Sequence, residues 1–258
     1  MNLLLENKVV LVSGSTRGIG KAVAREYLDE GARVAITGLH SDSTLQSAND
    51  LSQMFGSSRV TSFAGDLTIA EEIKKCTRHV LDEFGQIDIL VANVGSGSGN
   101  AGVSLNDEEW SGMMNLNFDG ARRLTDAILP TMLNKQSGSI VYISSIAGKE
   151  VLGAPIHYSV AKASLNAYAK NLSKKLAGTN IRVNTVCPGN IFVEGGTWDT
   201  KLKKDTSAVM QMLNDTVSLK RLGRPEEIAH IVVFLSSEKA SFLTGSCIVV
   251  DGGQTISF

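Results

Sequence analysis

The 258-residue chain carries 25 Lys and Arg residues against 26 Asp and Glu residues, which gives a net charge of -1 and a pI near 6.4. This balance provides no general electrostatic attraction to nucleic acid or to anionic membranes, so we expect neither as a partner. Hydrophobic residues make up 43% of the chain, which is long enough to bury a large core without a metal or disulfide.

The three cysteines and four histidines fall in no metal-ligand spacing, so we expect no metal site. We interpret Cys76, Cys187 and Cys247 as small apolar core residues in a reducing compartment. The amino-terminal residues lack the features of a signal peptide, and no stretch of about twenty apolar residues follows. These features predict a cytoplasmic protein.

A continuous apolar run at residues 8–13 is typical of a parallel strand that is buried on both faces. A glycine loop follows at once, and then a helical pattern that ends at Gly31. Glycines allow the backbone to turn sharply and to approach a pyrophosphate, whose charge the helix amino end stabilises. This order predicts a dinucleotide-phosphate site made of Gly14, Ser15, Thr16, Arg17, Gly18, Ile19 and Gly20.

Residues 33–37 form the second predicted strand, and folds of this kind select between NAD and NADP at its end. An NAD enzyme usually carries an acidic residue there, whereas this chain has Gly38, Leu39, His40 and Ser41. The side chain of His40 could hydrogen-bond to a 2′-phosphate. The missing carboxylate therefore favours NADP, and NAD stays open.

Strand patterns recur at residues 59–64, 87–92, 138–145, 181–186 and 245–250, separated by helical patterns. This alternation predicts one α/β domain over residues 1–258. We expect a doubly wound Rossmann-type fold with a mostly parallel seven-stranded sheet and helices on both faces. Residues 110–134 read as a long helix, and residues 190–218, rich in methionine, as a substrate lid.

Tyr158 and Lys162 lie four residues apart in a helical pattern, so their side chains share one face. A phenol with a pKa near ~10 works as a general acid or base at neutral pH only if a cation stabilises its phenolate. Lowering that pKa to ~7 takes about 4 kcal/mol, which a unit charge ~4 Å away supplies at an effective dielectric near 20 but not in water. The pair therefore predicts a catalytic site that is partly shielded from water, near Ser145 at a strand's carboxyl end.

Ser145, Tyr158 and Lys162 in this spacing, together with Asn117 and the glycine loop, resemble the short-chain dehydrogenase/reductases. The resemblance runs over nearly the whole chain and is strongest to the 3-oxoacyl-carrier-protein reductases. It implies that Tyr158 protonates a substrate carbonyl oxygen to which Ser145 hydrogen-bonds. It also implies that Lys162 lowers the tyrosine pKa and binds the nicotinamide ribose, and that Asn117 opens its helix locally and anchors a relay water.

The same resemblance assigns further residues to the cofactor. Arg17 would reach a 2′-phosphate, and Asp66, followed by Leu67, would bind the adenine. The remaining positions lie near the nicotinamide half: Asn93, Gly95, Pro188, Gly189 and Ile191. Two positions depart from the family pattern, because Ala92 replaces an asparagine and Val193 replaces a threonine. The lost threonine hydroxyl removes a hydrogen bond that is typically worth about 1 kcal/mol.

The sequence therefore predicts an NADP-dependent oxidoreductase that transfers a hydride between the nicotinamide and a carbonyl or secondary alcohol. A 3-oxoacyl thioester, a small polar ketone and a sugar ketone all stay open as substrates. One alternative is an NAD-dependent dehydrogenase of a sugar, polyol or steroid, and another is a catalytically silent dinucleotide-binding sensor or scaffold. The family resemblance further implies a homotetramer, and the lysines at 201, 203 and 204 raise a carrier protein as a weaker expectation.

Overall fold

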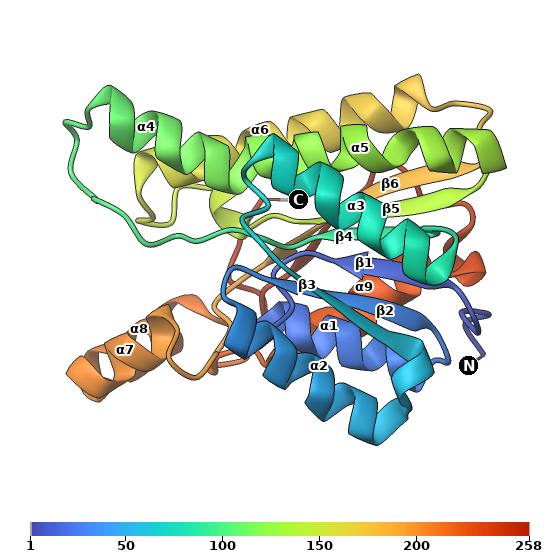
Figure 1. Cartoon of the computed structure of the whole chain (residues 1–258). Helices are drawn as coiled ribbons and strands as arrows, with labels where there is room; N and C mark the ends of the chain where they lie inside the picture. The colour runs from blue at the N-terminus through green and yellow to red at the C-terminus, as the bar shows by residue number, and fades with distance from the viewer. Residues whose placement is uncertain (1, 258) are drawn as a thin grey trace.

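Short runs of β-branched and other apolar residues form one sheet of seven parallel strands in the order β3-β2-β1-β4-β5-β6-β7 (Figure 1). The computed structural model describes residues 2–257; Met1 and Phe258, the ends of the predicted 1–258 domain, lie outside them. The predicted mostly parallel seven-stranded sheet is confirmed. The strands are β1 (Val9–Val12), β2 (Arg33–Gly38), β3 (Val60–Ala64), β4 (Ile89–Ala92), β5 (Gly138–Ile143), β6 (Ile181–Pro188) and β7 (Cys247–Val250).

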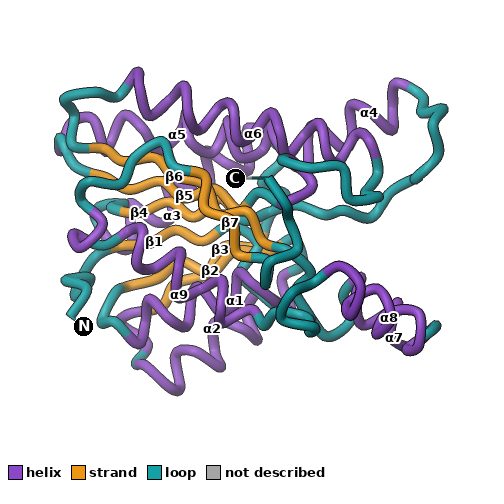
Figure 2. Tube along the Cα trace, turned by 180° about the vertical axis from the view of Figure 1, so that it is seen from behind, coloured by secondary structure: helices purple, strands orange, loops and turns teal. Residues whose placement is uncertain are grey.

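Helices cover both faces of this sheet, with α1, α2 and α9 on one side and α3, α5 and α6 on the other (Figures 1 and 2). Their bounds are α1 (Gly18–Asp29), α2 (Ser41–Phe55), α3 (Ala70–Phe84), α4 (Asp107–Met114), α5 (Gly120–Lys135), α6 (Ile156–Lys175), α7 (Thr197–Lys204), α8 (Thr206–Thr216) and α9 (Pro225–Ser236). Short helical turns are η1 (Ser57–Arg59), η2 (Asn115–Asp119), η3 (Ile146–Gly148) and η4 (Glu238–Ala240).

The strands read as continuous apolar runs because both faces of the sheet are buried. In β1, Val10 and Val12 belong to the core beneath α1 and α9, whereas Val9 and Leu11 belong to the core beneath α3, α5 and α6. Successive side chains of a strand point to opposite faces, so each strand supplies both cores. Two hydrophobic layers on one parallel sheet give the doubly wound fold that the sequence predicts.

Three segments differ from, or add to, the sequence prediction. The predicted helix at 110–134 is α4 and α5 joined by the π-helical turn η2, in which Asn117 lies. Helix α2 has no counterpart in the prediction, because its buried positions include the polar Thr44 and Ser47 beside Ala48 and Leu51. An apolar periodicity is therefore absent from its sequence.

The segment predicted as a lid contains α7 and α8, which project from the body of the domain (Figure 2). Val209, Leu213 and Val217 form a small core of their own, against which Trp198 and Met212 pack. Met210 stays exposed. Most of the apolar side chains named here therefore serve to pack α7 and α8 against each other. No helix within residues 2–257 combines the length and apolar character that a membrane crossing requires.

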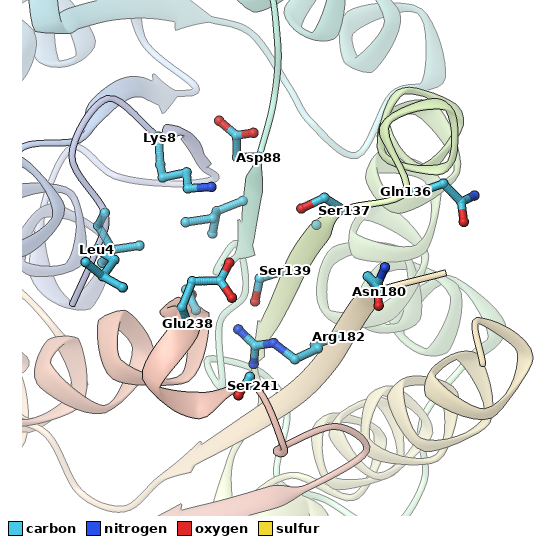
Figure 3. Close-up of a pocket in the computed structure, with 14 residues that line it drawn as sticks. Leu4, Lys8, Asp88, Gln136, Ser137, Ser139, Asn180, Arg182, Glu238 and Ser241 are labelled. Atoms are coloured by element: carbon cyan, nitrogen blue, oxygen red, sulfur yellow. The ribbon is translucent and has the colours of Figure 1, made fainter. Parts of the chain in front are cut away.

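A polar cavity of about 300 Å³ lies at the amino ends of β1, β4, β5 and β6, the edge opposite the predicted catalytic residues (Figure 3). Its charged lining residues include Lys8, Asp88, Arg182 and Glu238. The Asp88 carboxylate accepts hydrogen bonds from the Val9 N-H and from the ammonium of Lys135, which ties α5 to the sheet. Much of this polarity is therefore already engaged within the protein.

Arg182 connects the start of β6 to the carboxyl end of α9. Its guanidinium donates to the carbonyl oxygens of Leu235 at 2.6 Å, Ser237 at 3.0 Å and Leu243 at 3.2 Å. Carbonyls at a helix end have no intrahelical partner, so a charged donor there satisfies groups that would otherwise be unpaired. One side chain thus holds the last helix and the connection to β7 against the sheet.

Replacing Arg182 with Met should lower the free energy of unfolding by about 2–4 kcal/mol, because several half-buried carbonyls lose a charged donor. Urea denaturation measures this change. Arg25→Met is the matched control, since the Arg25 side chain is 60% exposed and lies 3.8 Å from Asp29, and it should change stability by less than about 0.5 kcal/mol. Equal effects from the two substitutions would contradict the capping role.

Candidate active site

The glycine loop between β1 and α1 has the backbone conformation that a close-approach site requires. Gly14 and Gly18 have φ of 63° and 56°, a region that favours glycine. A Cβ on Gly20 would lie 2.2 Å from the Gly14 carbonyl oxygen, so this position excludes every larger residue. No side chain caps the amino end of α1, and its first turn contains no acidic residue. The helix end therefore suits a bound phosphate group.

Neighbouring strands hold this loop in place. The Asn93 side chain donates to the carbonyl oxygens of Ser13 at 3.0 Å and Gly14 at 2.9 Å. Ser15 is fully buried; its hydroxyl donates to the Val12 carbonyl at 2.8 Å, and its N-H donates to the Thr37 carbonyl. Ser15 therefore shapes the loop from inside rather than pointing its hydroxyl at a ligand.

The residues predicted to contact the adenosine half follow the carboxyl ends of β2 and β3, apart from Arg17. Arg17 immediately precedes α1, and its guanidinium donates to the Gly195 carbonyl at 3.3 Å. The carbonyl of His40 accepts the Thr44 hydroxyl at 2.7 Å at the start of α2. One carboxylate oxygen of Asp66 accepts from the N-H and hydroxyl of Thr68, at 2.9 and 2.8 Å.

Thr16 and Leu67 complete this side of the predicted site. A Cβ on Gly38 would lie 2.5 Å from the Thr16 methyl, so the glycine loop packs directly on the end of β2. Leu67 is 6% exposed and belongs to the core beneath α3 and α5. Its side chain is therefore a core residue, and only its backbone is free to serve the predicted cofactor contact.

Ser145, Tyr158 and Lys162 come together at the carboxyl end of β5. The Ser145 hydroxyl oxygen accepts from the Ala147 N-H at 3.1 Å, and the Ser145 side chain is close enough to the Tyr158 phenol to act on its pKa. The Lys162 ammonium donates to the Ile143 carbonyl at 2.9 Å and lies 5.8 Å from the centroid of the Tyr158 ring. The structure thus brings the three predicted side chains into one cluster.

Burial sets the protonation states of this cluster. Burial raises the pKa of Tyr158, and the neighbouring Ser145 hydroxyl opposes that rise only in part. Burial lowers the pKa of Lys162 to about 8. In the protein without cofactor, burial therefore disfavours the charged form of both side chains.

Asn117 is fully buried in the π-helical turn and faces the same cluster. Its amide accepts from the Ser96 N-H at 3.0 Å and donates to the Ser96 carbonyl at 3.1 Å. A Cβ on Gly95 would lie 2.7 Å from Asn117 Oδ1 and 2.9 Å from Lys162 Nζ. Gly95 therefore occupies the point where the two polar groups converge. Asn115 instead accepts a hydrogen bond from Arg123.

Pro188 is the last residue of β6, and Gly189 and Ile191 lie in the segment that follows it. A Cβ on Gly189 would lie 2.7 Å from the Asp251 Cα, so the turn rests on the chain that follows β7. Ile191 forms an isolated parallel bridge with Gly223. A Cβ on Gly18 would lie 3.0 Å from Val193, so this valine packs on the phosphate loop where the family pattern has a threonine.

Two features of the site have no signal in the sequence. Gly97 lies over the phenol, because a Cβ there would be 3.5 Å from the Tyr158 ring. The Glu150 carboxylate accepts from the backbone N-H groups of Ile256 at 3.1 Å and Ser257 at 2.6 Å. These hydrogen bonds attach the chain end to the segment between Ser145 and Tyr158. The contact joins residues that are far apart in the sequence, which no local pattern reports.

The cluster supplies a protonated phenol, a hydroxyl and a buried amine at one edge of the sheet, beside a loop suited to phosphate. This arrangement can hold a carbonyl oxygen and give it a proton. Within residues 2–257, no group of three or more His, Cys, Asp or Glu side chains is placed to hold a metal ion.

Comparison with known proteins connects this geometry to a family. Residues 14–255 match the family model described as enoyl-(acyl carrier protein) reductase. The chain is 35% identical to a 3-oxoacyl-[acyl-carrier-protein] reductase of Chlamydia muridarum, covering 98% of this chain and 100% of that protein. It is 34% identical to the Thermotoga maritima protein of the same name, with 98% and 99% coverage.

Solved structures give the same result. The L-sorbose reductase of Gluconobacter frateurii, in complex with NADPH and L-sorbose, superposes with a TM-score of 0.94 and 32% identity over 100% of both chains. A 7α-hydroxysteroid dehydrogenase complexed with NADH superposes with a TM-score of 0.89 and 27% identity, covering 99% of this chain and 98% of that one. By its matched sequence, its fold and its oxidoreductase relatives, the chain belongs to the short-chain dehydrogenase/reductase family.

Proposed function

We propose that this oxidoreductase is an NADPH-dependent carbonyl reductase, with Tyr158 as the proton donor. The observation that carries the proposal is the convergence of Ser145, Tyr158 and Lys162 at the carboxyl end of β5, where the buried Lys162 ammonium lies 5.8 Å from the centroid of the Tyr158 ring. Reduction of a carbonyl consumes a proton at oxygen, so a phenol that is protonated at neutral pH suits this direction. Oxidation of an alcohol would instead require the phenolate.

Each residue of the cluster has a defined task in this mechanism. The Ser145 hydroxyl binds the substrate carbonyl oxygen, and Tyr158 gives that oxygen its proton as negative charge develops on it. Lys162 binds the nicotinamide ribose and restores the proton through a path that Asn117 holds open beside Gly95. When bound, NADPH supplies the hydride. The convergence of Asn117 and Lys162 on Gly95 supports this relay.

The proposed preference for NADPH rests on charge. Residues 38–41, at the end of β2, include no carboxylate, and Arg17 lies at the amino end of α1. Its guanidinium contacts only a backbone carbonyl, so it is free to exchange that partner for phosphate. The solved L-sorbose reductase holds NADPH. The remaining predicted positions, including His40, Asp66, Pro188 and Ile191, are proposed to line the same cofactor.

Two substrate classes have specific support. The curated relatives named above are 3-oxoacyl-[acyl-carrier-protein] reductases, which favours a 3-oxoacyl thioester. The L-sorbose complex favours a sugar ketone. The lysines expected to attract an acidic carrier protein are partly engaged, since Lys203 pairs with Asp199 at 2.8 Å and Lys201 lies over the Trp198 ring. We therefore propose the thioester as first substrate, and a ketose as the second candidate.

The predicted lid and homotetramer are also proposals. Helices α7 and α8 project beside the site from a small core of their own, which suits a segment that moves as a unit. Ile156 and Val160 are 46% and 42% exposed on α6, and association of two copies would cover such apolar side chains. The predicted cytoplasmic location is consistent with three free cysteines.

Tyr158→Phe should lower NADPH turnover with an acetoacetyl thioester by at least about a hundredfold, because the general acid is lost. NADPH absorbance measures the rate, and L-sorbose should be assayed in parallel. Tyr168→Phe is the matched control on the same helix; its ring packs against Phe118, and it should keep near-normal turnover. If Tyr158→Phe stays active, the proposed mechanism fails. If neither substrate is consumed by the wild type, a panel with NAD and polyols tests the dehydrogenase and silent-binder alternatives.

Arg17→Ala should raise the Kd for NADPH by about tenfold or more, since a charge-assisted contact to phosphate is worth about 1.5–3 kcal/mol. The Kd for NADH should change by less than about twofold. Fluorescence titration measures both constants, with Arg25→Ala on the same helix as control. An equal loss for the two cofactors would refute the assignment of Arg17 to the 2′-phosphate.

The affinity for NADPH should fall as pH rises through about 8, the pKa to which burial lowers Lys162 in the free protein. The sign follows because the ammonium, present below that pH, forms charge-assisted hydrogen bonds that the neutral amine does not. We expect a loss of about three- to tenfold between about pH 7 and pH 9. Lys162→Met should bind weakly at both pH values, and Lys170→Met should behave as wild type. An unchanged wild-type affinity would argue against ribose binding by Lys162.

A further inference from the structure

Cys187 and Cys247 are 60 residues apart in the sequence, yet their Sγ atoms lie 3.2 Å apart. Cys187 belongs to β6 and Cys247 to β7, and both are free thiols. The strand register pairs Cys247 with Thr185, two residues before Cys187, so the two side chains lie on the same face of the sheet. A disulfide has an S–S length of about 2.0 Å, and because the two cysteines are two residues out of register, bonding also requires the backbones of β6 and β7 to shift.

The two thiols differ in accessibility and in charge. Cys187 is fully buried, whereas Cys247 is half-buried. The hydrogen bond to Cys247, together with burial, raises the pKa of Cys187. The same hydrogen bond lowers the pKa of Cys247, and the ammonium of Lys149 acts in the same direction. Cys247 is thus the thiolate that a reagent from solvent would meet, with a protonated thiol directly behind it.

The pair lies directly against the catalytic cluster. Cys187 Sγ is 3.6 Å from the side-chain oxygen of Asn166 on α6, one turn after Lys162. Asn166 and Lys162 share one face of α6, so Cys187 lies beside the helix that carries Lys162. Pro188 follows Cys187 and ends β6, and Val193, five residues further on, packs on the glycine loop. A change in bonding at Cys187 is therefore transmitted within one residue to the proposed nicotinamide pocket.

We infer that Cys187 and Cys247 are an oxidation site for small peroxides, which converts them to an internal disulfide and disables the adjacent catalytic cluster. Cys76 is excluded from this chemistry, because it is buried in α3 and burial raises its pKa to about 12. Disulfides of intracellular proteins are usually transient and redox-sensing, which suits a pair that is reduced in the resting protein.

The chemistry balances without a further reactant. The Cys247 thiolate attacks one oxygen of the peroxide, the O–O bond breaks, and Cys247 becomes a sulfenic acid as hydroxide or an alkoxide leaves and takes a proton from water. The Cys187 sulfur then attacks the Cys247 sulfur, the S–O bond breaks, and water leaves with the thiol proton. Two thiols lose two electrons in total, and the peroxide gains them.

Disulfide formation would draw Cys187 toward β7 and away from Asn166. The turn at Pro188 and Gly189 has little room to adapt, since a Cβ on Gly189 would already lie 2.7 Å from the Asp251 Cα. A shift of about 1 Å near reacting groups commonly costs up to about a hundredfold in rate. Oxidation should therefore lower both NADPH binding and turnover, and a thiol reductant should restore them.

The test treats the full-length wild type, Cys247→Ser and Cys76→Ser with hydrogen peroxide, then alkylates free thiols in denaturant. Peptide mapping without reduction identifies cross-links, and NADPH fluorescence titration measures cofactor binding before and after dithiothreitol. We expect a cross-linked Cys187–Cys247 peptide in the wild type and in Cys76→Ser, with NADPH affinity lowered at least about tenfold and restored by reductant. Cys247→Ser should form no cross-link and should keep its affinity.

Absence of the cross-linked peptide in oxidised wild type would overturn the inference. Equal loss of affinity in Cys247→Ser would do the same, because damage elsewhere would then be responsible. A cross-link that leaves NADPH affinity unchanged would overturn the coupling to the site. The expected loss of turnover rests on the proposed function, but peptide mapping requires no substrate, so failure of the carbonyl reductase proposal is distinguishable from failure of this one.

Discussion

The carboxyl edge of the sheet is built around the Lys162 ammonium, which is held inside the domain. Lys162 is only 3% exposed, and its one direct hydrogen bond within the described residues goes to the Ile143 carbonyl at the end of β5. A buried charge is costly unless it is paired, and the cost appears as a pKa lowered to about 8. The lysine ammonium therefore has N-H donors without direct acceptors in the protein, and ribose hydroxyls and a relay water would accept from them.

The surrounding chain is shaped around that ammonium. Gly95 leaves the space between Lys162 and Asn117 free, and Gly148 allows η3 to pack on α6, where a Cβ would lie 2.7 Å from the Lys162 carbonyl carbon. The π-helical turn brings Asn117 into the space beside Gly95, since π-turns redirect a side chain within an otherwise regular helix. Two glycines thus leave the space that the lysine side chain needs, and the π-helical turn directs the Asn117 side chain toward it.

The sequence predicted the sheet, most helices and the catalytic cluster because their signals are local. Apolar runs mark the buried strands. Tyr158 and Lys162 are four residues apart, so their side chains share one face of any α-helix that contains them. Helix α2 was missed, since small polar residues such as Thr44 and Ser47 fill its buried face. The thiol contact and the Glu150 contact to the chain end were missed for another reason. Both join distant segments across the completed fold.

Protonation states were the other part that sequence reasoning could not supply. The spacing of Tyr158 and Lys162 predicts that the lysine lowers the tyrosine pKa, but it does not report how deeply either side chain is buried. In the folded chain both groups are buried, and burial opposes ionisation of each. Burial thus moves the two pKa values of the free protein in opposite directions, raising that of Tyr158 and lowering that of Lys162.

The two edges of the sheet treat polar groups in opposite ways. At the amino edge, the charged residues of the cavity are largely engaged, as Asp88 and Arg182 show by bonding to strand and helix backbone (Figure 3). At the carboxyl edge, the amino end of α1 has no side-chain cap, and within residues 2–257 the Lys162 ammonium donates directly only to the Ile143 carbonyl. An incompletely satisfied edge costs stability in the free protein. That cost is recovered only when a ligand supplies the missing partners, which is why function concentrates at this edge.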